Sequence, residues 1–251
     1  GYMDIAPDDK GENIRREICL TLARMGIFPE CSHHEEGPGQ NEIDFRYSDP
    51  LTAADNVMTF QSIVKFIAER NGLCADFSPK PLGDAPGSGF HINVSVKAAD
   101  GRDCLYQMVA GVLDKVEEMT LFLNPAKESY ARFGGHKAPR YISWSRENRS
   151  QLVRIPAAVG EYRRAELRSP DPCANPYLAF ALMIRAGLWG IEQRLELPAA
   201  ADFNFYQADR ETLSRFRCLP ANPAQAVRAA DSAFIRESVP EAVLAEYRKP
   251  R

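Results

Sequence analysis

Several common features are missing from this sequence, and each absence excludes a class of protein. The six cysteines form no C-x-x-C pair, which argues against a zinc knuckle or a disulfide framework and indicates reduced thiols in the cytoplasm. The longest strongly apolar stretch, residues 177–184, is too short to cross a bilayer. A net charge of −3 gives no reason to expect a nucleic-acid partner or a membrane surface. Walker and kinase-type glycine loops are also missing, so any nucleotide must be bound by another architecture.

Helical and strand patterns are both present, without a regular alternation. Apolar residues recur at helical spacing over residues 11–25, 50–71, 103–119, 175–196 and 223–234. Short strands are predicted over residues 27–31, 41–47, 89–97, 150–156 and 162–168. Residues 124–140, rich in glycine, proline and charge, are predicted to form an irregular loop. Because no βαβ rhythm connects these elements, an α+β fold fits better than a doubly wound sheet.

The predicted strand over residues 89–97 has the most informative pattern. Apolar residues alternate with polar ones, so one face suits a core and the other carries His91, Asn93 and Ser95. A glycine-rich turn containing Gly87 precedes it, where backbone can approach a ligand closely. An imidazole, an amide and a hydroxyl in line indicate either a binding site or an ordinary solvated face, and the pattern alone does not decide between them.

Charged residues share one face of the predicted strand over residues 162–168. A carboxylate, Glu166, lies between the guanidiniums of Arg164 and Arg168. This pattern slightly favours an exposed ion-pair ladder, which contributes little stability. The alternative is a site in which the carboxylate binds a metal and the arginines bind carboxylate or phosphate groups. Further arginines at 132, 149 and 154, in a slightly acidic chain, favour a phosphate site balanced by a metal.

Acidic residues flank a tight glycine–proline loop at residues 37–39. Glu35 and Glu42 converge if the loop returns the chain to an adjacent strand. Hard divalent cations such as Mg²⁺ prefer oxygen ligands, and carboxylates supply them in phosphoryl-transfer sites. The neighbouring His33 and His34 are interpreted as surface or structural residues rather than ligands.

The chain resembles the catalytic domain of glutamine synthetase, especially the type I forms. The blocks that carry the resemblance occur in the family's order: His33-His34-Glu35, Gly39-Gln40-Asn41-Glu42, Pro79-Lys80-Pro81, Gly87-Ser88-Gly89-Phe90-His91, Asn124-Pro125, Ser129-Tyr130-Ala131-Arg132, Asn148-Arg149-Ser150, Arg154-Ile155-Pro156, Glu166-Leu167-Arg168-Ser169-Pro170-Asp171-Pro172 and Ala174-Asn175-Pro176-Tyr177. The resemblance implies one catalytic domain over residues 1–251. It also implies an α+β fold in which helices pack on the outer side of a curved, mostly antiparallel sheet.

The resemblance further implies a reaction and its reactants. ATP phosphorylates the γ-carboxylate of glutamate, and ammonia then displaces phosphate to give glutamine. The cofactor implied is Mg²⁺ or Mn²⁺, and the full-length protein is expected to be a ring-shaped homo-oligomer in the cytoplasm, with no nucleic-acid or membrane partner.

Residue roles are carried over from the matching positions. Metal ligands are expected at Glu35, Glu42, His91 and Glu166. Nucleotide contacts are expected at Asn93 and Ser95, with phosphate-handling arginines at Arg149, Arg154 and Arg164. Glutamate contacts are expected at Gly87, Arg132 and Arg168. The candidate catalytic residues are Arg132, Arg149, Arg164 and Lys137.

Three departures from the family pattern stand out. The family's upstream Glu-x-Glu metal-binding strand and its N-terminal β-grasp domain have no counterpart in residues 1–251, so the chain is expected to be a fragment with little activity of its own. Lys137 occupies the flap position where the family has a glutamate that helps to deprotonate ammonium. A lysine is ordinarily cationic and repels ammonium. The adjacent His136 is the alternative proton acceptor.

Two further functions stay open beside glutamine synthesis. The changed flap residue suits a γ-glutamyl-amine ligase that accepts a polyamine or ethanolamine in place of ammonia. It also suits a non-catalytic relative that binds nucleotide or glutamate without turnover. Comparing ammonia with amines in a phosphate-release assay on the full-length protein distinguishes the two ligases, whereas the non-catalytic relative is expected to bind nucleotide without turnover.

Overall fold

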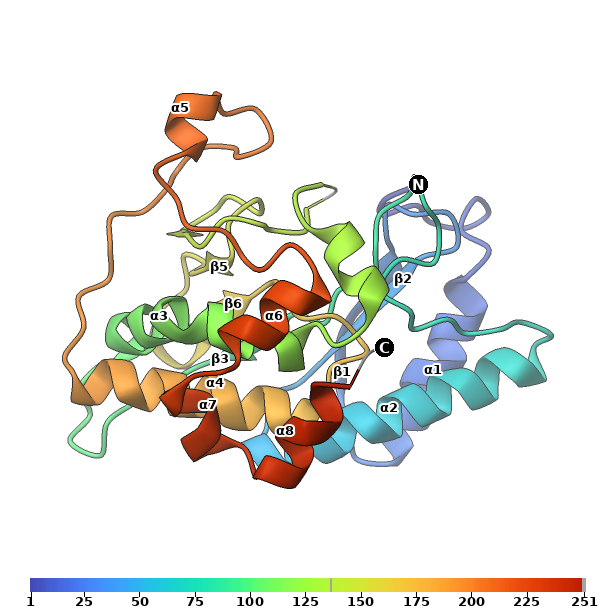
Figure 1. The fold of residues 1–251 in the computed structure, drawn as a ribbon. Coiled ribbons are helices and arrows are strands. Elements are labelled where there is room, and N and C mark those ends of the chain that lie inside the picture. The colour runs from blue at the N-terminus through green and yellow to red at the C-terminus, as the bar shows by residue number, and fades with distance from the viewer. Residues whose placement is uncertain (136, 250–251) are drawn as a thin grey trace. The chain divides into compact units, whose positions relative to one another are not determined.

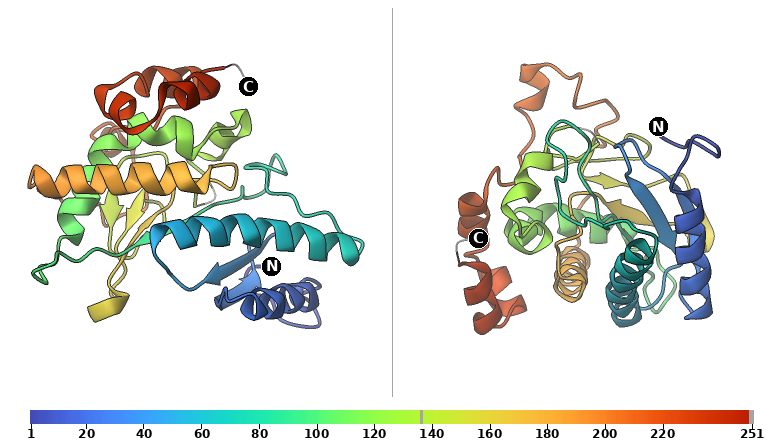
Figure 2. Two further views of the ribbon diagram at one scale, coloured as in Figure 1. Left: turned by 90° about the horizontal axis from the view of Figure 1, so that it is seen from below. Right: turned by 90° about the vertical axis from the view of Figure 1, so that its right-hand side faces the viewer.

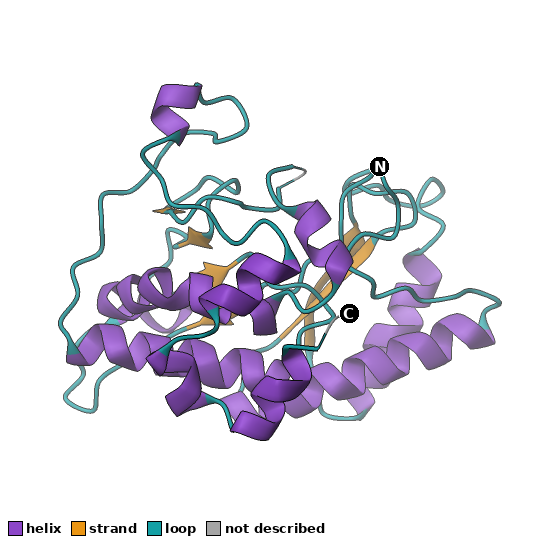
Figure 3. Ribbon diagram, viewed as in Figure 1, coloured by secondary structure: helices purple, strands orange, loops and turns teal. Residues whose placement is uncertain are grey.

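The computed structural model describes residues 1–135 and 137–249, which form two compact units. The first unit contains residues 1–77 and 81–88, and the second contains residues 78–80 and 89 onward. Helices and strands are both present in each unit, and the strands are few and short (Figure 3). None of the helices formed by the described residues combines the length and apolar character that crossing a lipid bilayer requires.

The first unit packs two helices against one face of a β-hairpin. Its elements are α1 (Glu12–Arg24), β1 (Pro29–His34), β2 (Asn41–Phe45) and α2 (Pro50–Arg70). Asp49 caps α2 by accepting a hydrogen bond from the Thr52 amide, and proline occupies the first turn, where its missing N–H costs nothing. The core contains Ile18, Leu22, Ile27 and Ile67. Ile43 and Phe45 pack on it from β2, so the intervening residues of that strand point the other way.

The second unit is built around a four-stranded sheet in the order β3-β6-β5-β4. The strands are β3 (Ile92–Val94), β4 (Trp144–Ser145), β5 (Val153–Arg154) and β6 (Ala165–Leu167). β6 pairs antiparallel with both β3 and β5, whereas β4 pairs parallel with β5. These short strands place residues from three distant parts of the chain side by side at the centre of the unit.

Helices cover the apolar face of this sheet. The helices of this unit are α3 (Leu105–Leu123), α4 (Pro176–Glu192), α5 (Arg210–Leu213), α6 (Pro223–Ala229), α7 (Ala233–Ser238) and α8 (Glu241–Tyr247). Of these, α5 lies apart from the sheet and has no buried residue (Figure 1). In the second unit, α3 and α4 lie between the sheet and the C-terminal helices α6–α8 (Figures 1 and 2). Asn175 caps α4 by accepting hydrogen bonds from the amides of Tyr177 and Leu178. The arrangement confirms the α+β class.

Several predicted elements differ from the structure at their ends. The strand predicted over residues 27–31 lies at 29–34, and those predicted over 89–97, 150–156 and 162–168 shorten to two or three paired residues. The helix predicted over residues 223–234 is wrong in extent, because Ser232 caps a new helix and divides the region between α6 and α7, and a further helix, α8, follows Pro240. The predicted loop over residues 124–140 contains a 3₁₀ helix, Lys127–Arg132.

Candidate active site

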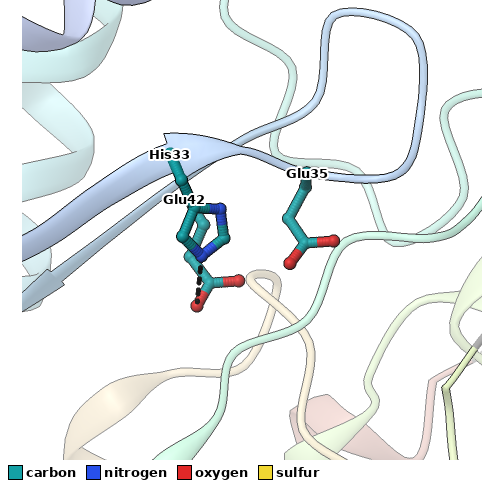
Figure 4. Close-up of side chains that lie close together, drawn as sticks. All are labelled: His33, Glu35 and Glu42. Carbon is teal, nitrogen blue, oxygen red and sulfur yellow. Dashed lines mark ion pairs between the residues drawn. The ribbon is translucent and has the colours of Figure 1, made fainter. Parts of the chain in front are cut away.

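The polar face of the β1–β2 hairpin brings His33, Glu35 and Glu42 together. His33 pairs directly with Glu42 in the antiparallel register, so both side chains emerge on the face opposite Ile43. One ligand atom from each of the three residues lies within 4.8 Å of the others, and Figure 4 shows the side chains converging. The predicted convergence of Glu35 and Glu42 is therefore observed, and His33 is part of the group.

Glu42 lies in a strongly acidic setting. Burial raises its pKa to about 8, and the nearby carboxylates of Asp44 and Glu35 act in the same direction. Without a cation, the Glu42 carboxyl therefore holds a proton at neutral pH. A divalent ion beside these groups would relieve the repulsion that favours the proton.

The raised pKa of Glu42 makes the stability of the metal-free protein depend on pH. Between its ordinary pKa and about pH 8, Glu42 is protonated in the folded state but ionised in the unfolded state. The free energy of unfolding therefore falls as pH rises through this range, and the contribution of Glu42 is lost at about pH 8. We expect Glu42→Gln, in chelator, to be more stable than the wild type at pH 8 and to differ little at pH 5. Urea midpoints measured from pH 5 to 9 test this, with the exposed Glu30→Gln as control. Parallel profiles for wild type and Glu42→Gln would contradict it.

Gln40 ties the hairpin turn to the predicted substrate loop. Its side-chain amide nitrogen donates to the Gly87 carbonyl at 3.0 Å, while its side-chain oxygen accepts from the Gly37 amide at 3.0 Å. The Gln40 carbonyl also accepts from the amide of Glu35 at 2.8 Å. One residue thus positions both a predicted metal ligand and Gly87.

In the second unit, Glu166 is the centre of a buried polar cluster. It lies on β6 and is 5% exposed. Arg168 Nη1 donates to its Oε1 at 2.6 Å, and Arg154 Nε donates to its Oε2 at 2.6 Å. His91 Nδ1 lies 3.2 Å from Oε1. The predicted exposed ion-pair ladder is therefore wrong for Glu166 and Arg168. Their strand is a central strand of the sheet, and both side chains are buried.

This cluster fixes the charge states of its members. Burial by itself disfavours the Glu166 carboxylate, but the contact with His91 and the charges of Arg168 and Arg154 hold its pKa below the usual value. Burial lowers the pKa of His91, which favours the neutral imidazole. A carboxylate beside a neutral imidazole is a donor pair that a divalent cation can use.

The remaining nucleotide-site candidates occupy the outer part of the same sheet. Asn93 and Ser95 are exposed, as the alternating pattern predicts for that face. Arg164 Nε donates to the Asn93 side-chain oxygen at 3.2 Å and Nη1 donates to the Tyr162 carbonyl at 3.2 Å. Arg149 precedes the buried Ser150 in the segment that leads to β5. Burial lowers the pKa of Arg168, and the nearby charges of Arg154 and Arg149 act in the same direction.

Arg132 is held in a buried network that the sequence did not reveal. It is 4% exposed, and its Nη1 donates to the Ser169 carbonyl at 3.0 Å and lies 3.8 Å from Asp171 Oδ2. Asn124 donates to the same Asp171 oxygen at 2.9 Å and so fixes that carboxylate. Arg132 Nε is buried and has no hydrogen-bond partner among the described residues.

The flap residue Lys137 has a left-handed backbone, with φ of 63°. Its carbonyl accepts a hydrogen bond from Arg168 Nη2 at 3.4 Å, so the flap backbone contacts a predicted glutamate-binding arginine. His136, the alternative proton acceptor, lies outside the described residues.

The predicted ligands thus fall into two sets, one in each unit. Glu35 and Glu42, with His33, form the first, and His91 and Glu166, with Arg154 and Arg168, form the second. That the two sets surround one cavity stays a prediction.

Comparison with known proteins identifies a family. The profile described as "Glutamine synthetase, catalytic domain" matches residues 1–251. A glutamine synthetase of Clostridium saccharobutylicum is 47% identical over 82% of this chain and 49% of its own length. A glutamine synthetase of Methanosarcina mazei is 44% identical over 98% of this chain and 59% of its own length. The chain spans about half the length of the curated relatives it matches.

Solved structures agree with this match. A protein named GmaS, in complex with ADP, superposes with a TM-score of 0.88 at 30% identity, covering 98% of this chain and 60% of that one. The glutamine synthetase of Plasmodium falciparum superposes with a TM-score of 0.85 at 22% identity, covering 99% of this chain and 59% of that one, and so supports the fold alone.

Proposed function

The chain belongs to the glutamine synthetase family, and we propose that it carries the catalytic residues for ATP-dependent ligation of ammonia to the γ-carboxylate of glutamate. The observation that carries the proposal is the Glu166 cluster, where His91, Arg154 and Arg168 meet one buried carboxylate. These residues come from three separate motifs, and they combine metal donors with groups that bind phosphate or carboxylate.

The chemistry explains why such groups are needed. A carboxylate is a poor acylating agent because its leaving group would be oxide, and transfer of a phosphoryl group from ATP supplies a better one. The resulting γ-glutamyl phosphate then reacts with ammonia and releases phosphate. Phosphoryl transfer needs positioning and charge neutralisation more than covalent help from the protein. Removing one electrostatic stabiliser of this kind typically lowers the rate by about 10²–10³.

The donor sets fit the divalent cations expected for this reaction. Glu35 and Glu42 point to one side of the hairpin, and His91 lies beside Glu166. We assign Mg²⁺ or Mn²⁺ to these positions, where the ion would supply charge neutralisation at the phosphates. Each Glu166 oxygen accepts one arginine hydrogen bond, and Oε1 is also in contact with His91 Nδ1 at 3.2 Å.

The substrates are assigned to the polar groups around these ligands. Arg132 and Arg168 bind the glutamate carboxylates, and Gly87 contacts its amino-acid end. Asn93 and Ser95 contact the nucleotide. Arg149, Arg154 and Arg164 neutralise its phosphates. The complex of GmaS with ADP supports nucleotide binding by a related chain. Assembly into a ring-shaped homo-oligomer in the cytoplasm belongs to the same proposal.

The test is a coupled assay on the full-length gene product. With ATP, glutamate and ammonia, we expect equal amounts of phosphate and glutamine. Nucleotide or glutamate binding without turnover would instead support the non-catalytic alternative.

For residues 1–251 alone we propose little or no glutamine formation, because the family's Glu-x-Glu ligands have no counterpart among them. Robust turnover by residues 1–251 would overturn that part only.

Lys137 favours a second candidate, ligation of an amine rather than ammonia. If the lysine disfavours ammonium, Lys137→Glu should raise the ratio of kcat/KM for ammonia to kcat/KM for ethanolamine or a polyamine. The expected increase is about tenfold or more, because the interaction between two charges a few ångströms apart is worth about 1–4 kcal/mol. Steady-state phosphate release with each nucleophile measures the ratio. Lys137→Gln separates loss of the positive charge from gain of a carboxylate. Lys127→Glu, an exposed lysine of the preceding segment, is the matched control. An unchanged ratio in Lys137→Glu removes the reason for this candidate.

A further inference from the structure

We propose that Asp171 and Asn124 are positioning residues for glutamate binding, because they hold the guanidinium of Arg132 in one orientation beside the Glu166 cluster. The inference rests on the proposed function, which assigns Arg132 to a glutamate carboxylate. It adds two residues that have no role among the assignments made from the sequence or from the family resemblance.

Four polar groups around Arg132 form a closed ring of contacts. Arg132 Nη1 donates to the Ser169 carbonyl at 3.0 Å and lies 3.8 Å from Asp171 Oδ2. The side-chain nitrogen of Asn124 donates to the same carbonyl at 2.8 Å and to the same carboxylate oxygen at 2.9 Å. The guanidinium and the amide therefore share both acceptors. A rotation of the guanidinium would break a hydrogen bond to a buried carbonyl, which is costly.

Asp171 and Asn124 are themselves held by rigid parts of the second unit. Asp171 Oδ1 accepts from the Cys173 amide at 3.0 Å, and the Asp171 amide donates to the Leu123 carbonyl at 3.2 Å. Asn124 directly follows helix α3. Both side chains belong to residues that are 0% exposed, so bulk water does not compete for their hydrogen bonds. A group supported in this way can fix the orientation of a functional side chain.

The second terminal nitrogen of Arg132 lies on the side of the Glu166 cluster. A Cβ built on Gly89 would lie 3.6 Å from Arg132 Nη2 and 2.9 Å from His91 Nε2, so both nitrogens lie beside the same glycine. Burial lowers the pKa of His91, and the charges of Arg168 and Arg132 act in the same direction. The ring of contacts thus holds Nη1 while Nη2 lies where the proposed glutamate site is.

A buried arginine that binds an anionic substrate also needs a counter-charge before the substrate arrives. Burial lowers the pKa of Arg132, the carboxylate of Asp171 opposes this, and the charge of Arg168 acts with burial. Glu166 serves Arg168 and Arg154 in the same way. A guanidinium that is paired and ordered in advance loses little conformational entropy when its ligand binds. The pairing with Asp171 should therefore strengthen glutamate binding specifically.

Ligand binding to the full-length protein tests the proposal. Titration calorimetry measures the affinity for ADP with Mg²⁺, and then the affinity for glutamate with both present. We expect Asn124→Ala and Asp171→Asn to weaken glutamate binding by about tenfold or more, while ADP affinity changes by less than about twofold, because misplacing a binding group by about 1 Å can cost about 10²-fold.

Tyr130→Phe is the matched control from the same segment. The Tyr130 hydroxyl is buried with no hydrogen-bond partner among the described residues, so this variant should bind glutamate as the wild type does. Urea midpoints show whether each variant is folded. Asn124→Ala keeps the ion pair between Arg132 and Asp171, and so it carries the test if Asp171→Asn does not fold.

A double-mutant cycle separates positioning from a merely structural role. In an Arg132→Lys background, Asn124→Ala should change glutamate affinity by about twofold or less, because the planar fork that it orients is gone. Equal effects in both backgrounds, or equal losses of glutamate and ADP affinity, would overturn the inference. If Arg132→Lys weakens glutamate binding but folded Asn124→Ala does not, the inference also fails and the proposed function stands. If Arg132→Lys itself leaves glutamate binding unchanged, the glutamate site of the proposed function fails as well.

Discussion

Replacing Glu166 with glutamine is expected to destabilise the second unit by about 3–5 kcal/mol, the typical effect of leaving a buried charge without its partner. Glutamine preserves the shape of the side chain but not its charge. Arg168 is 3% exposed and would lose the carboxylate that accepts its hydrogen bond at 2.6 Å, and Arg154 would lose the same partner. We also expect ligation to be lost, because the residue is a proposed metal ligand.

The urea midpoint at a constant m-value measures this loss. The control is Glu211→Gln, which removes an exposed ion pair with Arg215 at 2.8 Å and should cost about 1 kcal/mol or less. Because the pKa of Glu166 is held below its usual value, its ion pairs contribute fully above the ordinary carboxyl pKa and weaken only as pH falls below it. The difference between wild type and Glu166→Gln should therefore be constant from pH 6 to 8. A cost equal to that of Glu211→Gln would contradict the buried cluster.

The Glu166 cluster also shows where sequence reasoning stops. The alternating pattern correctly placed Arg164, Glu166 and Arg168 on one face, but it could not show that the face is covered. Burial depends on β6 lying between β3 and β5, and the pairing of β6 with β3 joins Ile92 to Leu167, which are 75 positions apart. The arginine pattern indicated a charged site, and the resemblance implied a role for each residue in it. Only the strand pairing shows that Arg154 and Arg168 both donate hydrogen bonds to the Glu166 carboxylate.

The first unit gives the complementary case. Glu35 and Glu42 were predicted to converge because a tight turn separates them, and the structure agrees. His33 was missed because adjacent histidines look equivalent in sequence. Their difference arises from a pairing register, which decides the face on which each side chain lies. The buried network around Arg132 was missed for a related reason. Asn124 and Asp171 are far apart in the sequence, and their contact forms only when α3 packs against the sheet.

Glycines in the middle of helices α3 and α4 carry the last prediction. Glycine disfavours a helix by about 1 kcal/mol relative to alanine, so its presence there needs a packing reason. A Cβ built on Gly190 would lie 2.1 Å from the Gln107 carbonyl oxygen, and one on Gly111 would lie 2.1 Å from the Ala186 carbonyl oxygen. Both obstacles are backbone atoms of the facing helix. The two helices therefore pack at backbone contact, and no side-chain rotation can make room.

We expect Gly190→Ala to destabilise the protein by about 3 kcal/mol, the upper part of the range for overpacking, despite the better helix propensity of alanine. The urea midpoint is again the measurement. Gly187→Ala, on the same helix, meets only the flexible Met108 side chain and should cost less. Gly83→Ala, where a Cβ has open space, should be neutral or slightly stabilising, because alanine restricts the unfolded chain. If all three variants unfold at the same urea concentration, α3 and α4 do not pack at the distance described. The sheet that holds Glu166 shares its core with α3 and α4, so the same substitution should also weaken ligand binding at the Glu166 cluster.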